Sequence, residues 1–252
     1  MVALVTIEGL TKRFPKQAEP ALRSVSTQIR SGHIVGLVGP DGSGKTTFLR
    51  LIAGLLRADE GGIDVGGFDP VANAKEVRAR IAYMPQRFGL YEDLSVEENL
   101  NLYADLRGLV GSARKATFER LLDFTGLAPF TGRLAGALSG GMKQKLGLAC
   151  ALVVTPELLL LDEPSVGVDP ISRRELWRMV SRLTDEGITV VWATAYLDEA
   201  EKCETVLVLS EGDLIFDGRP TDLAARVAGR VFLIEGIEGD RRYVLNRARQ
   251  HE

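Results

Sequence analysis

The chain has 252 residues, of which 45% are hydrophobic and 26% are charged, and its formal net charge at pH 7 is -3. This length suffices for one large domain or two small ones, and the composition is ordinary for a globular protein in water. The small net charge argues against a general nucleic-acid binder and against a basic protein that coats membranes.

The cysteines and the N-terminal residues indicate in which cellular compartment the protein is expected. Cys150 and Cys203 lie far apart and outside any C-x-x-C pattern, which favours a reducing compartment over a disulfide framework or a zinc site. Residues 2–8 lack the basic region and the cleavage site of a signal peptide. No apolar stretch approaches the roughly 18 to 20 residues that a membrane span needs, so we expect a soluble chain that reaches any membrane through a partner.

Apolar patterning in the first third of the chain predicts strands and two helices. Strands are predicted at residues 2–8, about 23–30, 34–38, 63–65 and 81–86. Helices are predicted at 47–53 and about 71–79. Phe14 lies between the first two strands, where it could stack on a base or pack on the core as a loop residue.

The pattern changes to helices between about residues 87 and 155. Ser95 and Glu98 form a capping box before the first predicted helix, a second covers about 112–125, and a third begins at Ser139. Strands and helices then alternate again. The predicted strands are 158–161, 188–193, 206–209, 213–216 and 231–235, and the helices are 170–183 and about 221–228. We therefore predict an α/β core that is interrupted by a helical insertion.

The segment from Gly39 to Thr46 fits the pattern G-x-x-x-x-G-K-S/T, between a predicted strand and a predicted helix. Glycines let the backbone turn its N–H groups toward an anion, and the helix N-terminus adds roughly half a positive charge. Lys45 would reach the β- and γ-phosphates of a nucleotide, and the Thr46 hydroxyl would bind Mg2+. The alternative is a glycine-rich turn with a surface lysine. The predicted nucleotide contacts are Gly39, Pro40, Asp41, Gly42, Ser43, Gly44, Lys45, Thr46 and Thr47.

Two acids follow the continuous apolar run at 158–161, at a strand end where ligand sites of α/β sheets lie. Asp162 would hold Mg2+ through water, and Glu163 would be the general base, a role typically worth about 10²–10⁴ in rate. A helix cap or a solvated turn is the alternative for such a pair. Four leucines that lead straight into the acids, in a chain with a phosphate loop, favour the catalytic interpretation.

A second anion-binding helix N-terminus is predicted at Ser139, Gly140 and Gly141, inside the helical insertion. A single nucleotide does not easily need both phosphate-binding ends from one molecule. Two copies that meet head to tail can use both, because each serine end then closes on the nucleotide in the partner's phosphate loop. The sequence therefore predicts a dimer.

These motifs, with the stretch LSGGMKQ from Leu138 to Gln144, resemble the nucleotide-binding domain of ABC transporters over nearly the whole chain. The resemblance implies an α/β P-loop NTPase fold with a RecA-like core, an N-terminal antiparallel β-subdomain and an inserted α-helical subdomain. It implies ATP and Mg2+ as cofactors, with a second ABC ATPase domain and transmembrane permease subunits, but no nucleic acid, as partners. The implied location is peripheral, at the cytoplasmic face of the cell (inner) membrane.

The resemblance also implies domain boundaries. The ATPase domain would cover residues 1–229, with its core at 1–86 and 156–229 and the helical subdomain at about 87–155. Residues 230–252 would form a C-terminal tail, a linker or the start of a truncated region.

Individual residues take roles from the same resemblance. Phe14 would stack on adenine, and Gln86 would join the Mg2+ and water shell and signal to a membrane domain. Asp169 ends a segment that resembles the loop crossing the dimer interface, and residues 87–90 would lie near the groove for a permease coupling helix. The implied catalytic residues are Glu163, Gln86 and Lys45, and the implied metal ligands are Thr46, Gln86 and Asp162. The serine end would contribute Ser139, Gly140, Gly141 and Gln144.

One position departs from the family pattern. The switch histidine of the family follows the strand after the interface loop, and Ala195 occupies that place here. Alanine has no donor for the γ-phosphate, and loss of one such donor typically costs about 10²–10³ in turnover. Neither His33 nor His251 is expected to replace it. We therefore predict a site that binds ATP but hydrolyses it slowly, while the Ser139 end serves an active site on the partner.

Two stretches, residues 89–94 and 169–177, are particularly similar to the first ATPase domain of a tandem-ATPase exporter subunit implicated in drug and cation efflux. Two ATPase domains in one polypeptide suit two sites of unequal activity. This resemblance would also make the chain a fragment of a tandem-ATPase subunit.

Two other functions are compatible with the sequence. An ATP-gated dimerisation or regulatory module would use nucleotide mainly to join two domains, with little hydrolysis. A soluble ABC ATPase that works on DNA or ribosomes would resemble members with a long coiled coil or a basic linker, and neither is visible in this sequence.

Overall fold

The computed structural model describes residues 3–15, 17–86 and 89–227. The chain divides into two compact units, Met1–Pro220 and Thr221–Glu252. Of the second unit, only the part that belongs to helix α8 (Pro220–Val227) is described. The strand predicted at 231–235 and the tail predicted at 230–252 lie outside the described residues.

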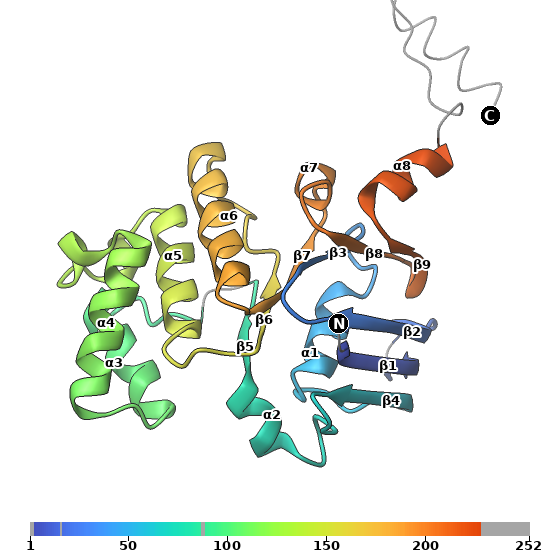
Figure 1. The fold of residues 1–252 in the computed structure, drawn as a ribbon, viewed down its shortest axis with the longest axis horizontal. Coiled ribbons are helices and arrows are strands. Elements are labelled where there is room, and N and C mark those ends of the chain that lie inside the picture. The colour runs from blue at the N-terminus through green and yellow to red at the C-terminus, as the bar shows by residue number, and fades with distance from the viewer. Residues whose placement is uncertain (1–2, 16, 87–88, 228–252) are drawn as a thin grey trace, which may run out of the picture. The chain divides into compact units, whose positions relative to one another are not determined.

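A six-stranded sheet forms the centre of the first unit (Figure 1). Five of its strands are parallel, and the last pairs antiparallel with its neighbour. Their order is β5 (Ile81–Met84), β6 (Leu158–Asp162), β7 (Thr189–Thr194), β3 (Ile34–Val38), β8 (Thr205–Ser210) and β9 (Asp213–Gly218). Strands β3, β6 and β7 are buried along their whole length, which explains their continuous apolar sequences. The phosphate loop and the two acids follow β3 and β6 at the same edge of this sheet.

A second, three-stranded sheet is antiparallel. Its order is β2 (Leu22–Arg30), β1 (Ala3–Lys12) and β4 (Glu60–Val65). Every second or third side chain of β2 faces the core, including Leu22, Val25 and Ile29. These side chains belong to one apolar cluster with Phe48 of helix α1 (Lys45–Ile52) and Leu160 of β6. One core therefore holds α1, and with it the phosphate loop, between the two sheets.

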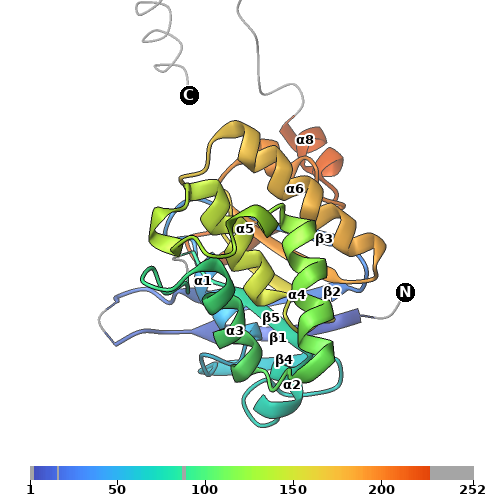
Figure 2. The ribbon, with the colours of Figure 1, turned by 90° about the vertical axis from the view of Figure 1, so that its left-hand side faces the viewer.

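Three helices form the insertion, which Figure 2 shows facing the viewer: α3 (Val96–Leu106), α4 (Gly111–Thr125) and α5 (Gly140–Ala151). The capping box is confirmed, because Ser95 Oγ accepts from the Glu98 N–H at 3.2 Å and the Glu98 carboxylate accepts from the Ser95 N–H at 2.8 Å. Helix α4 ends at Gly126, whose φ of 67° is left-handed. Helix α5 begins after Ser139, whose Oγ accepts from the Met142 N–H at 3.3 Å. All three helices of the insertion were predicted.

Three further helices flank the parallel sheet: α2 (Ala74–Arg80), α6 (Pro170–Asp185) and α7 (Leu197–Ala200). The helix predicted at 71–79 begins three residues late, because Asp69 Oδ1 accepts from the N–H groups of Val71 and Ala72 and folds this segment into a turn first. Helix α7 was not predicted, since four residues are too few for a periodic pattern.

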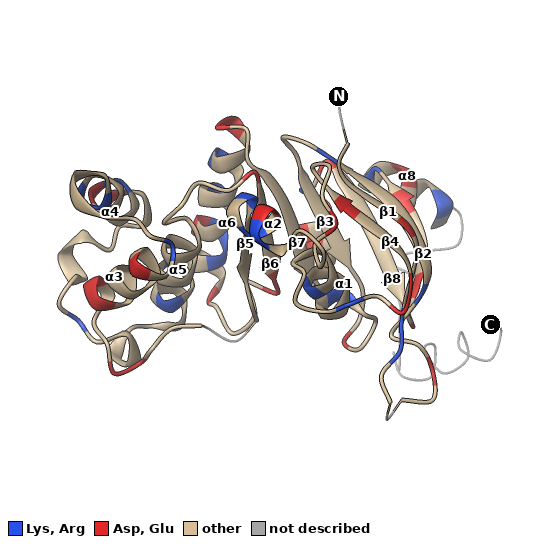
Figure 3. Ribbon diagram, turned by 90° about the horizontal axis from the view of Figure 1, so that it is seen from below, with Lys and Arg blue, Asp and Glu red and all other residues tan. Residues whose placement is uncertain are grey.

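Charges of both signs occur on the helices and strands of the described part of the chain (Figure 3). Among the described residues, no helix combines the length and the apolar character needed to pass through a bilayer.

Candidate active site

The loop between β3 and α1 depends on three glycines. Gly42 and Gly44 have φ values of 78° and 110°, which residues with a Cβ rarely adopt. A Cβ at Gly39 would lie 2.3 Å from the carbonyl oxygen of Leu209, and one at Gly44 would lie 2.6 Å from that of Ala21. The loop can therefore pass close to neighbouring backbone and place Gly44 as the N-cap of α1. The first N–H groups of such a helix lack intrahelical acceptors and attract anions.

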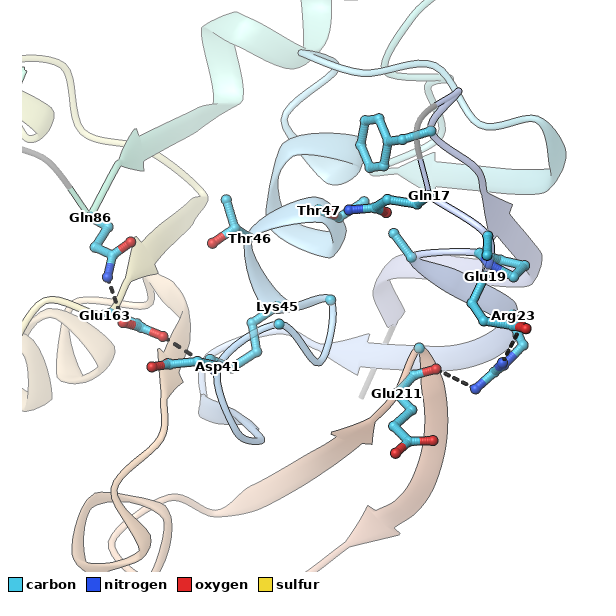
Figure 4. A pocket seen from close by; sticks show the side chains of 17 residues that line it. Gln17, Glu19, Arg23, Asp41, Lys45, Thr46, Thr47, Gln86, Glu163 and Glu211 are labelled. Carbon is cyan, nitrogen blue, oxygen red and sulfur yellow. Dashed lines mark hydrogen bonds and ion pairs between the residues drawn. The ribbon is translucent and has the colours of Figure 1, made fainter.

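Lys45 and Glu163 form a buried ion pair in the site (Figure 4), with side chains 4% and 9% exposed. Lys45 Nζ lies 3.1 Å from Glu163 Oε1 and donates to the carbonyl oxygens of Gly39 and Pro40 at 2.7 and 3.0 Å. Gln86 Nε2 donates to the second oxygen, Glu163 Oε2, at 2.8 Å. Glu163 therefore contacts both other residues predicted to be catalytic, although the three come from α1, the end of β6 and the segment after β5.

The backbone at Glu163 is strained. Its φ of 52° is in the left-handed region, which costs a residue with a side chain on the order of 1–3 kcal/mol. The Glu163 N–H donates to the carbonyl oxygen of Ala193 on β7 at 3.0 Å. Strand β6 thus ends in a fixed turn that holds the Glu163 carboxylate toward Lys45.

Thr46 and Asp162 bring two oxygens together beside this ion pair. Thr46 Oγ1 donates to Asp162 Oδ1 at 3.0 Å, and the Tyr83 hydroxyl donates to Asp162 Oδ2 at 3.0 Å. Asp162 is only 1% exposed. Burial raises the pKa of Tyr83 to about 12, so its hydroxyl keeps its proton and stays a donor at neutral pH.

These oxygens fit Mg2+, which prefers carboxylate and hydroxyl oxygens and keeps several waters. Within the described residues, no three His, Cys, Asp or Glu side chains gather into a metal site. Thr46 and Asp162 would therefore hold only part of the coordination shell, and phosphate oxygens and water would complete it. This is the arrangement expected of an ion that arrives with a nucleotide.

A pocket of about 930 Å³ opens over these groups. Nine of the predicted site residues line it: Phe14, Asp41, Gly42, Gly44, Lys45, Thr46, Thr47, Gln86 and Glu163. Gly39, Pro40 and Ser43 are not among the described residues that line it. Ser43 is 2% exposed, and its Oγ makes no hydrogen bond with the described residues.

The far end of the pocket was not predicted from the sequence. It is lined by Gln17, Glu19, Arg23 and Glu211 (Figure 4). Arg23 donates to the Glu19 carboxylate at 3.1 Å and to the carbonyl oxygen of Glu211. Since these residues come from the loop after β1, from the start of β2 and from the turn before β9, no local motif brings them together.

Residues 22–166 match the family model described as ABC transporter. The chain belongs to the ABC transporter family. The expected fold, with an ABC-type P-loop core and an antiparallel β-subdomain, is confirmed.

Two curated relatives and one solved structure define the similarity. The chain is 58% identical over 246 residues to the probable multidrug ABC transporter ATP-binding protein YbhF of Escherichia coli strain K12, covering 98% of this chain and 43% of YbhF. It is 32% identical over 237 residues to the linearmycin resistance ATP-binding protein LnrL of Bacillus subtilis strain 168, covering 94% and 76%. The fold matches the dimeric ATP-binding cassette MJ0796, in a post-hydrolysis state bound to ADP and Pi, with a TM-score of 0.77 and 25% identity over 86% of this chain and 98% of that one.

The chain therefore spans less than half the length of YbhF. The expected similarity to a longer multidrug transporter subunit is confirmed.

The ABC signature segment lies at the start of α5. Ser139 and Gly140 are exposed and are not among the described residues that line the pocket. The helix start packs on α6, since a Cβ at Gly141 would lie 2.4 Å from Ser172 Oγ. Gln144 is 2% exposed, and its Oε1 makes no hydrogen bond with the described residues. Within one chain, the structure does not bring the Ser139 end to the Lys45 pocket.

Asp169 is the N-cap of α6. Its Oδ1 accepts from the N–H groups of Ile171 and Ser172, both at 3.0 Å. Hydrogen bonds from Ser172, with a smaller contribution from Ile171, hold the pKa of Asp169 below its ordinary value. The carboxylate is thus ionised at neutral pH and points into the first turn of its own helix.

Ala195 follows the last residue of β7 and is exposed. The ring of Tyr196 lies 4.4 Å from the guanidinium carbon of Arg173. Ala195, Tyr196 and His33 are not among the described residues that line the pocket.

The expected permease groove at residues 87–90 is described only in part. Residues 89 and 90 are described, whereas 87 and 88 lie outside the described residues.

Proposed function

We propose that this chain binds and hydrolyses ATP to power an ABC exporter of drugs or cations. The observation that carries the proposal is the contact of Lys45 with Glu163 in a pocket where Thr46 also contacts Asp162. The names of YbhF, a multidrug transporter protein, and LnrL, a linearmycin resistance protein, support the transport role. The test is ATP hydrolysis by the purified chain with Mg2+, compared with the Lys45→Ala variant. Turnover that survives in this variant would contradict the proposal.

Each predicted site residue has a role in this proposal. Phe14 stacks on adenine, Lys45 and the loop N–H groups bind the phosphates, and Glu163 accepts a proton from the attacking water. Thr46, Gln86 and Asp162 hold Mg2+, which neutralises phosphate charge when bound. The loop contacts are Gly39, Pro40, Asp41, Gly42, Ser43, Gly44, Lys45, Thr46 and Thr47.

We infer that two ATPase domains meet head to tail. The exposed Ser139 helix end of one domain would close on the nucleotide of the other, with Gly140, Gly141, Gln144 and Asp169 at the same interface. The dimeric state of MJ0796 bound to ADP and Pi supports this arrangement. The partner of this chain would be a second domain of the same type, in the same polypeptide or in another copy.

The remaining parts of the proposal concern the assembly. The dimer would dock on transmembrane permease subunits at the cytoplasmic face of the inner membrane, as a peripheral component. Residues 1–229 would form the ATPase domain, with its helical subdomain at about 87–155, and residues 230–252 a tail or linker. Co-purification of the chain with membrane proteins encoded beside it tests the assembly.

We further propose that the chain's own site hydrolyses ATP slowly. Ala195 supplies no donor at the position of the family's switch histidine, and the ring of the neighbouring Tyr196 contacts Arg173. Installing the histidine with Ala195→His should therefore raise turnover, by up to about 10²–10³ if one transition-state donor is restored. Brisk turnover in the wild type, with no gain in the variant, would rule the idea out.

A second candidate function is favoured by the same residue. Without a γ-phosphate donor at Ala195, nucleotide could serve mainly to join two domains, as in an ATP-gated regulatory module. A dimerisation assay with and without ATP, run beside the turnover measurement, separates the two. Dimers that form with ATP and persist without hydrolysis, in wild type and Ala195→His alike, would favour the module.

A further inference from the structure

A buried carboxylate lies behind the phosphate loop, outside the pocket. Glu199, in the single-turn helix α7, is 4% exposed. Its Oε2 accepts from Thr194 Oγ1 at 2.6 Å and from Trp192 Nε1 at 2.9 Å, both on β7. Its Oε1 accepts from Arg173 Nη2 at 2.9 Å and from Arg173 Nε at 3.3 Å, on α6. The Glu199 side chain thus connects α7 to both β7 and α6 by hydrogen bonds.

Burial alone would raise the pKa of Glu199. Hydrogen bonds from Thr194, Trp192 and Arg173 outweigh burial and hold the pKa below its ordinary value. The carboxylate is therefore ionised at neutral pH, and every donor aimed at it finds a charged acceptor.

Thr194 connects this carboxylate to the phosphate loop. Its hydroxyl donates to Glu199 and accepts from the N–H of Tyr196 at 3.0 Å. Its carbonyl oxygen accepts from the N–H of Gly39, the first residue of the loop, at 3.3 Å. The preceding residue, Ala193, accepts from the N–H of Glu163. The end of β7 therefore carries backbone contacts to both halves of the site.

Arg173 connects the same carboxylate to α6. Its guanidinium lies over the Tyr196 ring at 4.4 Å, and its Nη2 is 3.5 Å from Asp198 Oδ2. The backbone N–H of Arg173 donates to the carbonyl oxygen of Asp169 at 2.9 Å, within the first turn of α6. Arg173 thus belongs to the first turn of α6 through its backbone, while its guanidinium contacts the segment after β7.

We propose that Glu199 is a positioning residue of the ATPase site, which orients the end of β7 and, through Thr194, the start of the phosphate loop against α6. This inference rests on the proposed function, because it assigns a further residue to the same site. Glu199 is not among the described residues that line the pocket over Lys45, so it would act on the site through Thr194 and Arg173.

The test is amide hydrogen exchange of the full chain, in wild type and in Glu199→Gln. Glutamine presents one acceptor and one NH2 group, which must face either Arg173 or the donors of β7, so one set of bonds is lost. Exchange at the amides of Gly39 and Tyr196 should rise at least tenfold. Turnover of ATP should fall at least tenfold, with the KM for ATP changed less than threefold. The matched control is Glu201→Gln, an exposed acid two residues away, which should leave all three readouts at their wild-type values.

Thr194→Val and Thr194→Ser provide a second route if Glu199→Gln fails to fold. The valine removes the hydroxyl and should raise exchange at Gly39, while the serine keeps the hydroxyl and should restore it. A folded Glu199→Gln with unchanged exchange at Gly39 and Tyr196 overturns the proposal, and so does an unchanged Gly39 in Thr194→Val. If the wild type shows no ATP turnover, the proposed function fails, yet the exchange data still decide the role of Glu199.

Discussion

Glu163 is buried, backbone-strained and paired with Lys45 at 3.1 Å. Glu163→Gln keeps the size of the side chain and an acceptor for Gln86 but removes the basic oxygen. We expect turnover to fall by about 10²–10⁴, while ATP still binds, because the Lys45 ammonium is freed from its ion pair. Phosphate release and equilibrium binding of ATP measure the two effects. Glu186→Gln, at an exposed acid after α6, is the control, and wild-type turnover in Glu163→Gln would contradict the assignment.

The two cysteines should be unreactive in the folded chain. Burial raises the pKa of both Cys150 and Cys203 to about 12. At pH 8 the thiolate fraction is then about a thousandfold below that of an ordinary cysteine. A colorimetric thiol reagent should find no reactive thiol in the native chain and two after denaturation in guanidinium. Rapid labelling of the native chain would show that one of these thiols is accessible.

At the scale of elements, the phosphate loop allows a matched pair of substitutions. At Gly44 the backbone is left-handed, with a φ of 110°, and an added Cβ would lie 2.6 Å from the carbonyl oxygen of Ala21. At Gly42 the backbone is also left-handed, with a φ of 78°, but an added Cβ would have no heavy atom within 4 Å. Gly42→Ala should cost about 1–2 kcal/mol of unfolding free energy. Gly44→Ala should cost more and also weaken ATP binding. Urea unfolding and ATP titration compare the two, and equal costs would show that the contact with Ala21 relaxes freely.

The N-cap of α5 is a second test at this scale. Ser139→Ala removes the acceptor for the Met142 N–H and should lower the unfolding free energy by about 0.5–2 kcal/mol. ATP affinity of the isolated chain should stay unchanged, because Ser139 is not among the described residues that line the pocket. A loss of affinity in the monomer would place the serine in its own site.

Elements that carry periodic or motif signals were predictable. The residues of β3, the capping box of α3 and the serine cap of α5 follow from local sequence, because each depends on neighbours within a few positions. Helix α7 and its Glu199 were missed, since the donors to that carboxylate come from Arg173 and from β7. Likewise, Arg23, which lines the pocket, donates to Asp213 across 190 positions of the sequence. Contacts of this kind leave no spacing in the sequence to recognise.

At the scale of the whole molecule, ATP should drive association. With hydrolysis blocked by Glu163→Gln, ATP and Mg2+ should shift the chain toward twice its mass in light scattering, while ADP should not. Adding Ser139→Ala to that variant should weaken the dimer, since the exposed helix end would lose its hydroxyl. A chain that stays monomeric at saturating ATP, with its pocket filled, would contradict the head-to-tail arrangement.

The strand order places β7 between β6 and β3. The acids leave the sheet on one side of it and the phosphate loop on the other, roughly 10 Å apart at the usual strand spacing. The segment after β7 therefore begins between the two acids and the phosphate loop, and its first residue, Ala195, is exposed. Because Ala195 is exposed, a larger side chain there has room without displacing the buried core. Under the proposed function, a substitution at position 195 would therefore change the rate of ATP hydrolysis while the sheet and the phosphate loop keep their structure.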